Sequence, residues 1–295
     1  MPWIIATTLL AIFFLVFPSA PSSFSLSDLA MAAPVSGSVD TVRVPEKKIP
    51  HISKPQRLSV AAPSYAAYDA SSRFSLTSQR ADEARSIASI TKLMTALVFL
   101  DHNPGWDKEV TITRADYREG GRINLFPGDS VTAGDLFRVG LVASDNVAIA
   151  ALVRSTGLSE KDFVAAMNEK ALRLRLSHSA FADPTGLDAR NVSTAHDIAR
   201  LAAAAFKEPA IRDTVTRSSY TFTTEQGNTK TIVSTDKLLE ADLDDGIALV
   251  AGKTGHLNEA GYCFVGQFEK DGHDVITVVL GADTESARFE ETKKL

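Results

Sequence analysis

Two residues with complementary chemistry, Ser89 and Lys92, lie three positions apart in the chain. The apolar run from Leu93 to Leu100 follows them, which predicts a buried helix whose first turn carries both polar side chains. Residues three apart share one face of a helix, so the hydroxyl and the amine should lie within reach of each other. Burial favours the neutral amine, and the N–H groups of a helix start favour negative charge on the serine oxygen. The pair is a candidate nucleophile and base, although a serine that only caps a core helix fits the same spacing.

Two more polar motifs follow later in the chain. Ser144-Asp145-Asn146 separates two apolar helical stretches, and Lys253-Thr254-Gly255 follows an apolar, strand-like run. Each motif alone is compatible with an ordinary turn. Ser-x-x-Lys, Ser-Asp-Asn and Lys-Thr-Gly in this order, however, form the set that penicillin-binding proteins and serine β-lactamases share. The combination indicates a nucleophilic serine at position 89.

The elements expected around these motifs form an α+β domain. Helical periodicity covers the middle of the chain and predicts helices at 136–143, 147–154, 160–174 and 194–206. Alternating patterns predict strands at 58–69, 73–77, 219–224, 247–255, 262–269 and 275–281, with a last helix at 285–295. Strands at both ends of a helical middle predict one antiparallel sheet from both chain ends, flanked by helices, with an inserted helical subdomain.

Beyond the three motifs, the chain from about Tyr65 to Leu295 resembles the D-alanyl-D-alanine carboxypeptidase and endopeptidase family of low-molecular-mass penicillin-binding proteins. The stretches that carry the resemblance are Ile87 to Ala96, Asp183 to Leu187, Asn191 to Ala195, and Lys253 to His256 followed by Ala260-Gly261-Tyr262. One departure is Ser86, where the family usually has proline, and it affects only local rigidity. The resemblance implies a β-lactamase/DD-peptidase-like fold. It also implies a penicillin-binding serine hydrolase that acts on peptidoglycan stem peptides as a D-Ala-D-Ala carboxypeptidase, a D,D-endopeptidase or both.

The resemblance also implies a role for each residue of the first two motifs. Ser89 would be the acylated nucleophile, and Lys92 the base that takes its proton. Ser144 would pass a proton to the leaving amine, while Asn146 would hold Lys92 and a substrate amide in place. Acylation of the serine would divide one difficult amide hydrolysis into two easier steps.

Substrate binding would fall to residues near the end of the chain. The resemblance implies that Lys253 supplies positive potential, that Thr254 binds the substrate carboxylate, and that the backbone N–H groups of His256 and the nucleophile form an oxyanion hole. Gly255 is expected to let the substrate approach closely, with an extended peptide paired along this strand. Arg288 matches a position that faces the terminal carboxylate of the substrate in the carboxypeptidase branch, and a surface ion pair is the alternative for it.

Composition argues against several other classes of function. The formal net charge of −5 over 295 residues gives no basic face for nucleic acid. Cys263 is the only cysteine, so it forms no internal disulfide and is expected to be a small buried residue. Neither His178 nor His196 has a second ligand at metal spacing. We therefore expect no metal or other cofactor, and we expect wall peptides as substrates and β-lactam antibiotics as inhibitors.

The N-terminal residues predict export. Trp3 to Phe17 is a 15-residue apolar run, short for a spanning helix and typical of a signal-peptide core. We expect residues 1–32 to be a signal peptide cleaved after Ala30-Met31-Ala32, or an uncleaved anchor. Residues 33–57 are expected to be a basic linker, either a solvated tether or a segment in loose contact with an anionic wall or membrane surface. The peptidase domain then occupies residues 58–295, in the periplasm or cell-wall space.

Two competing functions remain as alternatives. A serine β-lactamase needs a further base to hydrolyse the acyl-enzyme, and residues 175–190 hold only Asp183 and Asp188 as acids, without a Glu-x-x-x-Asn pattern. A non-catalytic module that senses wall peptides or β-lactams has no use for an activated nucleophile, and the intact motifs argue against it.

Overall fold

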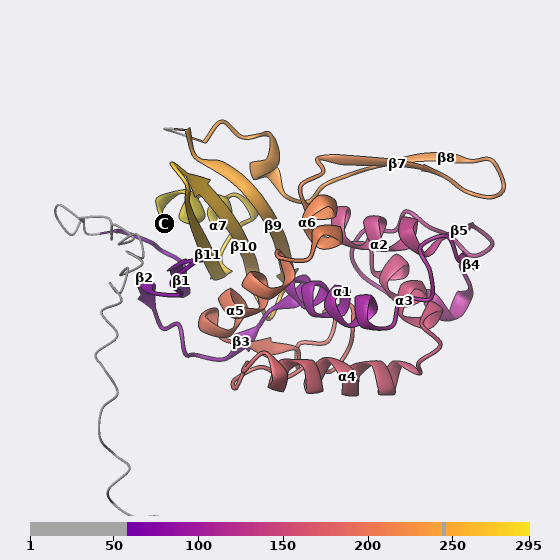
Figure 1. Cartoon of the computed structure of the whole chain (residues 1–295), viewed down its shortest axis with the longest axis horizontal. Helices are drawn as coiled ribbons and strands as arrows, with labels where there is room; N and C mark the ends of the chain where they lie inside the picture. Colours follow the sequence, from indigo (N-terminus) through magenta and orange to yellow (C-terminus); the bar gives the residue numbers. More distant parts are fainter. Residues whose placement is uncertain (1–57, 244–245) are drawn as a thin grey trace, which may run out of the picture. The chain divides into compact units, whose positions relative to one another are not determined.

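The computed structural model describes residues 58–243 and 246–295; the predicted signal peptide and linker lie outside these residues. At the centre of the described part is a five-stranded antiparallel sheet (Figure 1). Its strands, in spatial order, are β2 (Ser75–Gln79), β1 (Ser64–Asp69), β11 (His273–Ala282), β10 (Gly261–Lys270) and β9 (Ala248–Leu257). Because β1 pairs with β11, with Tyr65 opposite Val279, the sheet is built from both ends of the domain, as predicted.

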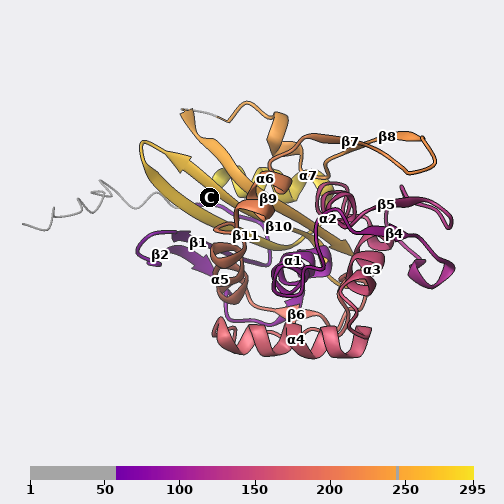
Figure 2. The ribbon, with the colours of Figure 1, turned by 45° about the vertical axis from the view of Figure 1, so that its right-hand side comes forward.

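Helices cover both faces of this sheet and form a subdomain at its side. They are α1 (Thr91–Asp101), α2 (Ala133–Val142), α3 (Asn146–Ser155), α4 (Glu160–Arg173), α5 (Ala195–Ala205), α6 (Pro209–Val215) and α7 (Glu285–Lys294). Helices α5 and α7 lie on opposite faces of the sheet, while α1 to α4 form a group beside the sheet, with α4 at the lower edge of the group (Figures 1 and 2). Several helices begin where a side-chain oxygen accepts a hydrogen bond from the backbone N–H three residues later, which fixes their starting points. These capping residues are Thr132, Asp145, Ser159, Thr194 and Thr284.

The helix that follows Ser89 is buried on nearly all sides. Every residue of α1 from Thr91 to Phe99 is buried, as an almost wholly apolar sequence requires. The Phe99 ring packs against Trp106 and Phe137, with ring centroids 5.7 and 5.6 Å away. A helix held this firmly by the core gives the residues at its start a fixed position.

The smaller elements differ from the sequence prediction. The strand expected at 219–224 forms as β7 (Ser219–Thr223), but it pairs with β8 (Thr229–Val233), which was not predicted. The two make a separate hairpin next to α2, outside the main sheet (Figure 1). The hairpin contributes Phe222 and Ile232 to the core, and its other side chains are largely exposed. An alternating pattern marks a strand but not the sheet to which it belongs.

Other short elements complete the described chain. Two further strand pairs are β3 (Arg85–Ser86) with β6 (Val192–Ser193) and β4 (Glu109–Thr111) with β5 (Ser130–Thr132). The 3₁₀ turns are η1 (Ala88–Ile90), η2 (Arg114–Asp116) and η3 (Lys237–Glu240).

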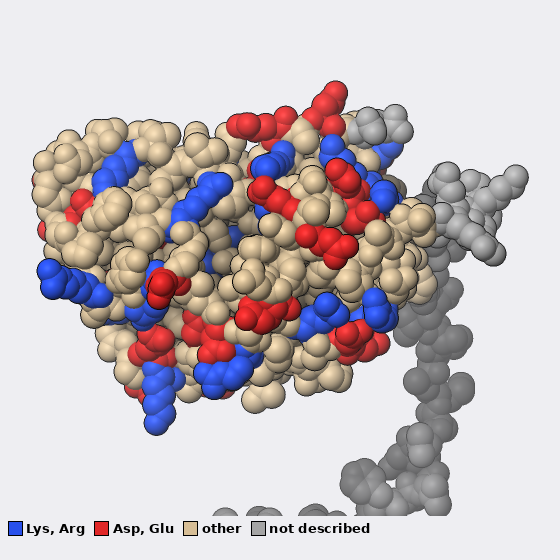
Figure 3. All heavy atoms as spheres, turned by 180° about the vertical axis from the view of Figure 1, so that it is seen from behind, with Lys and Arg blue, Asp and Glu red and all other residues tan. Residues whose placement is uncertain are grey.

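Within residues 58–243 and 246–295, no helix combines the length and the apolar character needed to cross a bilayer. Acidic and basic side chains are interspersed on the face seen in Figure 3.

Candidate active site

Ser89 lies in the turn η1, directly before α1, where the backbone is tightly constrained. Its neighbour Ala88 has a φ of 47°, in the left-handed region that residues other than glycine rarely adopt. A Cβ at Gly186 would lie 2.2 Å from the Ala88 carbonyl oxygen, and a Cβ at Gly255 would lie 2.7 Å from that of Ile87. The turn that carries Ser89 is therefore in close contact with two glycines, Gly186 and Gly255, from distant parts of the chain. Strained conformations held by surrounding structure are common where a reactive group must be presented.

The Lys92 amine is fully buried beneath Ser89. Its Nζ lies 2.9 Å from Ser89 Oγ, 2.7 Å from Asn146 Oδ1 and 2.6 Å from the Thr185 carbonyl oxygen. Burial lowers the pKa of Lys92 from 10.5 to about 7, although the carboxylates of Asp183 and Asp145 act in the opposite direction. A neutral amine that can accept a proton from the serine is thus well populated near neutral pH.

Each member of Ser144-Asp145-Asn146 has a separate structural task. Asp145 caps α3 by accepting a hydrogen bond from the Ala148 N–H at 2.9 Å, and its other oxygen accepts from the backbone N–H of Asn124 at 2.7 Å. Burial raises the pKa of Asp145. Asn146 accepts from Lys92 and donates through Nδ2 to the Gly120 carbonyl at 3.0 Å. Ser144 lies between the two helices with a φ of 57°, and its side chain lines a cleft. The interruption between the two apolar stretches therefore serves both the helix start and the site.

Lys253-Thr254-Gly255 lies on β9, at the edge of the sheet that faces the helical subdomain. The buried Lys253 amine lies 3.0 Å from Ser144 Oγ, so it links the sheet to the helices. Burial first, and the charge of Lys92 next, hold the pKa of Lys253 well below its usual value. Thr254 Oγ1 lies 2.6 Å from Thr235 Oγ1. A Cβ at Gly255 would first meet the protein's own Ile87 carbonyl, so the glycine lets β9 approach the turn that carries Ser89. Gly255 also lines the cleft, and its expected role in letting the substrate approach stays a prediction.

Arg288, on α7, is buried beside the end of β9. Only 4% of the residue is exposed, and its guanidinium donates to the Gly255 carbonyl at 3.3 Å. It lies over the Tyr262 ring at 5.5 Å and also contacts Glu285 at 3.4 Å. Arg288 thus forms an ion pair with Glu285, but its own side chain is not on the surface, because it is buried against the strand that carries Gly255. The His256 ring stacks on Tyr262 with centroids 4.0 Å apart.

These residues surround one cleft of about 420 Å³. Its walls include predicted site residues, namely Ser89, Ser144, Asn146, Thr254, Gly255, His256 and Arg288. Two lysines lie directly behind that wall: Lys92 is hydrogen-bonded to Ser89, and Lys253 to Ser144. The structure thus brings all nine predicted residues together from η1, α1, the α2–α3 junction, β9 and α7.

Several residues that line the cleft or contact its site residues were not assigned a role from the sequence. Thr185 contributes a backbone carbonyl, for which a side-chain motif gives no signal. Thr235 contacts Thr254 from a segment with no recognisable pattern. Gly121 and Arg122 line the cleft from a loop far away in sequence. Only the Asp183-Pro184-Thr185-Gly186 stretch offered a signal, through its match to the family.

The remaining predicted features are structural. Cys263 is fully buried, and burial raises the pKa of its thiol to about 11, so it is the small core residue expected. His196 lies 2.6 Å from Asp82. Among the described residues, no group of three or more His, Cys, Asp or Glu side chains is arranged to hold a metal ion. An activated serine in a cleft between a sheet edge and a helical subdomain defines a serine hydrolase.

Comparison with known proteins places this hydrolase in a family. The sequence model of the family described as D-alanyl-D-alanine carboxypeptidase matches residues 51–284. The D-alanyl-D-alanine endopeptidase of Haemophilus influenzae is 34% identical over 206 residues, 69% of each chain. The crystal structure of the Streptomyces K15 DD-transpeptidase gives a TM-score of 0.74 at 30% identity, over 80% of this chain and 95% of that one. Penicillin-binding protein D2 of Listeria monocytogenes, in its cefotaxime-bound form, gives 0.70 at 32% identity, over 82% and 98%.

The chain therefore belongs to the D-alanyl-D-alanine carboxypeptidase family, and it is a serine DD-peptidase. The fold predicted from the resemblance is confirmed by these structural neighbours. Enzymes of this class act on peptidoglycan peptides and bind β-lactams.

Proposed function

We propose that Ser89 attacks the carbonyl carbon of a D-Ala residue in a peptidoglycan stem peptide while Lys92 accepts the hydroxyl proton. The bond formed is the acyl-serine ester, and the bond broken is the amide to the next residue. The observation that carries this proposal is the 2.9 Å contact between Ser89 Oγ and a buried Lys92 amine with a pKa of about 7.

The leaving amine needs a proton, and Ser144 is placed to supply it. Ser144 lines the cleft, and its Oγ contacts the Lys253 amine, which can return a proton to it. Asn146 keeps Lys92 directed at Ser89, and because it also lines the cleft it can contact a substrate amide. Water then hydrolyses the ester, with the same amines moving the proton in the opposite direction.

Substrate orientation falls to the edge of β9. β9 ends the sheet, so a substrate strand can pair with it, with the carbonyl oxygen held by the backbone N–H groups of Ser89 and His256. The substrate carboxylate would meet Thr254 and the Arg288 guanidinium, which suits planar carboxylates. In a pentapeptide this carboxylate ends the chain. In a cross-linked dimer, the amine of the scissile bond can belong to the D-configured carbon of a diamino acid. That carbon also carries a carboxylate, which is equivalent to the terminal carboxylate of the pentapeptide. Arg288 is thus compatible with carboxypeptidase and endopeptidase activity alike, and we propose that the enzyme has both.

A β-lactamase is disfavoured by the way the loop at 183–191 uses its carboxylates. Asp183 accepts hydrogen bonds from the backbone N–H groups of Thr185, Gly186 and Asp188 at 2.9, 3.1 and 3.2 Å. Asp188 is occupied by Arg190 at 2.5 Å. Neither acid lines the cleft, so neither is placed to activate water for rapid deacylation.

We also propose that the protein is exported and works in the periplasm or cell-wall space. The apolar run Trp3 to Phe17 supports export, and the basic linker that follows supports loose contact with an anionic surface.

Product analysis on two substrates tests the activity. The mature protein is incubated with uncross-linked pentapeptide and with cross-linked dimer, and products are separated by chromatography and mass. Release of D-alanine and conversion of dimer to monomer are both expected, and Ser89→Ala should produce neither. Turnover of penicillin at a rate comparable to peptide cleavage would favour the β-lactamase, and labelling without any peptide turnover would favour the sensor.

A further inference from the structure

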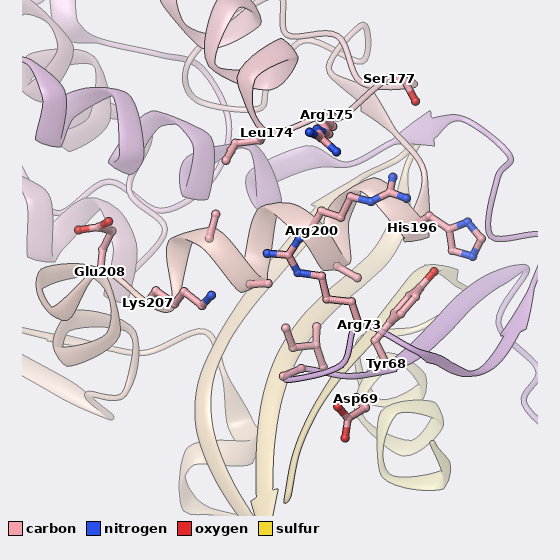
Figure 4. A pocket seen from close by; sticks show the side chains of 15 residues that line it. Tyr68, Asp69, Arg73, Leu174, Arg175, Ser177, His196, Arg200, Lys207 and Glu208 are labelled. Atoms are coloured by element: carbon pink, nitrogen blue, oxygen red, sulfur yellow. The ribbon is translucent and has the colours of Figure 1, made fainter. Parts of the chain in front are cut away.

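A second cavity, larger than the active-site cleft, lies on the α5 side of the sheet. Its volume is about 720 Å³, and it shares no lining residue with the cleft. It lies between α5, the β1–β2 turn and the C-terminal end of α4 (Figure 4). Ala199 and Ala203 of α5 and Ile276 of β11 give it apolar walls. We refer to it as the α5 cavity.

Positive charge gathers around the α5 cavity although the chain as a whole is acidic, with a net charge of −5. The cationic residues that line it are Arg73, Arg175, Arg200 and Lys207, and the acidic ones are Asp69 and Glu208. Asp69 Oδ1 is engaged by the side chains and backbone N–H groups of Ser71 and Ser72 in the β1–β2 turn. Arg200 pairs with the buried Asp197 at 2.8 Å. Within residues 58–243 and 246–295, no hydrogen bond or ion pair engages the side chains of Arg73, Arg175 and Lys207.

Two of these arginines occupy backbone positions that favour glycine. Arg73 has a φ of 61° and Arg175 a φ of 59°. Arg175 directly follows the C-cap of α4, where helices commonly end with a left-handed glycine. Both positions keep a long cationic side chain in a backbone conformation that carries a conformational cost. In Figure 4, Arg200 lies between Arg73 and Arg175, and the three come from three different segments.

We propose that the α5 cavity binds an acidic peptide, in the form of a peptidoglycan stem peptide other than the one being cleaved. Separate guanidinium groups suit several separate carboxylates, because each can engage one in a bidentate pair. The apolar walls suit the methyl groups of alanine residues, for which a phosphate-rich polymer has no counterpart. The chain's own segment 34–57 is an unsuitable occupant, because it carries five basic residues and two acidic ones. The identity of the ligand as a wall peptide rests on the proposed function.

A second peptide site would raise the concentration of the substrate polymer near Ser89. Neighbouring stem peptides are joined through the same polymer, so binding one of them makes the capture of another intramolecular. The expected consequence is a lower KM for polymeric substrate than for isolated stem peptide, with kcat unchanged.

The test uses full-length protein whose Ser89 has first been acylated with penicillin, so that the cleft is closed. The probe is an acidic tetrapeptide stem, which is the pentapeptide without its terminal D-Ala. It is titrated into the acylated protein, and the heat of binding is measured by calorimetry. The variant pair Arg73→Gly with Arg175→Gly removes two cavity charges at positions that accept glycine. Arg173→Gln with Arg217→Gln is the matched control, because both residues are exposed, pair with acids outside the cavity and carry the same charge.

The proposal predicts saturable, salt-sensitive binding that weakens at least tenfold in the glycine pair and changes little in the control pair. Absence of binding to the acylated wild type, or equal weakening in both pairs, would overturn it. Inorganic phosphate is the second probe: if phosphate displaces the peptide at similar concentration, the cavity is a phosphate site and the peptide assignment fails. Penicillin labelling of Ser89 is a separate readout, so failure of the proposed function is recognised independently. If labelling fails, the same comparison of variants on unlabelled protein still tests the cavity.

Discussion

The acylation rate of Ser89 should rise with pH through about 7. The base is the neutral form of Lys92, which is populated above its pKa, and burial brings this pKa from 10.5 to about 7. At pH 7 an exposed lysine holds about one amine in 3,000 in the neutral form, whereas a lysine with a pKa of about 7 holds roughly half. The structure therefore increases the supply of base about a thousandfold. Because Lys253 is also buried and coupled to Lys92, the measured midpoint belongs to the pair.

The assay is the second-order rate constant for acylation by a fluorescent penicillin, measured from pH 5 to 9. The rate should increase about tenfold for each unit of pH below the midpoint and level off above it. Asp145→Asn keeps a helix-capping side chain but removes a carboxylate that raises the pKa of Lys92, so the midpoint should move to lower pH. A flat profile between pH 5.5 and 8, or a midpoint near 10, would refute the assignment of Lys92 as the base.

Three further outcomes follow from other contacts. Gly255→Ala places a Cβ 2.7 Å from the Ile87 carbonyl oxygen. Urea titrations should therefore show that the free energy of unfolding falls by about 1–3 kcal/mol, and penicillin should label Ser89 more slowly. Wild-type values for both would contradict the packing role. Arg154→Gln should destabilise by about 1–2 kcal/mol at neutral pH. Burial alone would raise the pKa of Asp116, but hydrogen bonds from Arg154 and Thr113 hold it below its usual range, so this difference should shrink in urea titrations as the pH falls through that depressed pKa. Arg288→Gln should lower kcat/KM for pentapeptide about 10- to 100-fold but leave an amidated pentapeptide unaffected; an equal loss on both would show that Arg288 does not meet the carboxylate.

The main sheet and the residues of the site could be predicted because their signals are local. The apolar run after Ser89 predicts a buried helix. The polar triplet at 144–146 interrupts two helical stretches that would otherwise be continuous. Long alternating segments near both chain ends indicated strands, and the helical middle between them indicated one sheet built from both ends. The pairing of β1 with β11 is what the structure adds. Short motifs were informative only as an ordered set, because each one alone is common.

What the sequence did not provide depends on contacts between distant segments. The hairpin of β7 with β8 lies outside the main sheet, with Phe222 and Ile232 packed in the core. An alternating pattern predicts a strand but does not show with which strand it pairs. Gly255 was expected to let the substrate approach; the structure adds that it accommodates the Ile87 carbonyl, which only the tertiary structure brings beside it. The burial of Arg288 against β9 is likewise not apparent from the sequence of α7, in which most side chains are polar or charged. The Thr185 carbonyl that contacts Lys92 belongs to the backbone and leaves no side-chain signature.

The most direct test of the central claim is to locate the covalent adduct after reaction with penicillin. The intact mass should increase by one penicilloyl group per chain, and peptide mapping should place that group on Ser89. The Ser89→Ala variant should remain unmodified under the same conditions. An adduct on another residue, or an equal mass increase in Ser89→Ala, would contradict the account of this cleft as the active site.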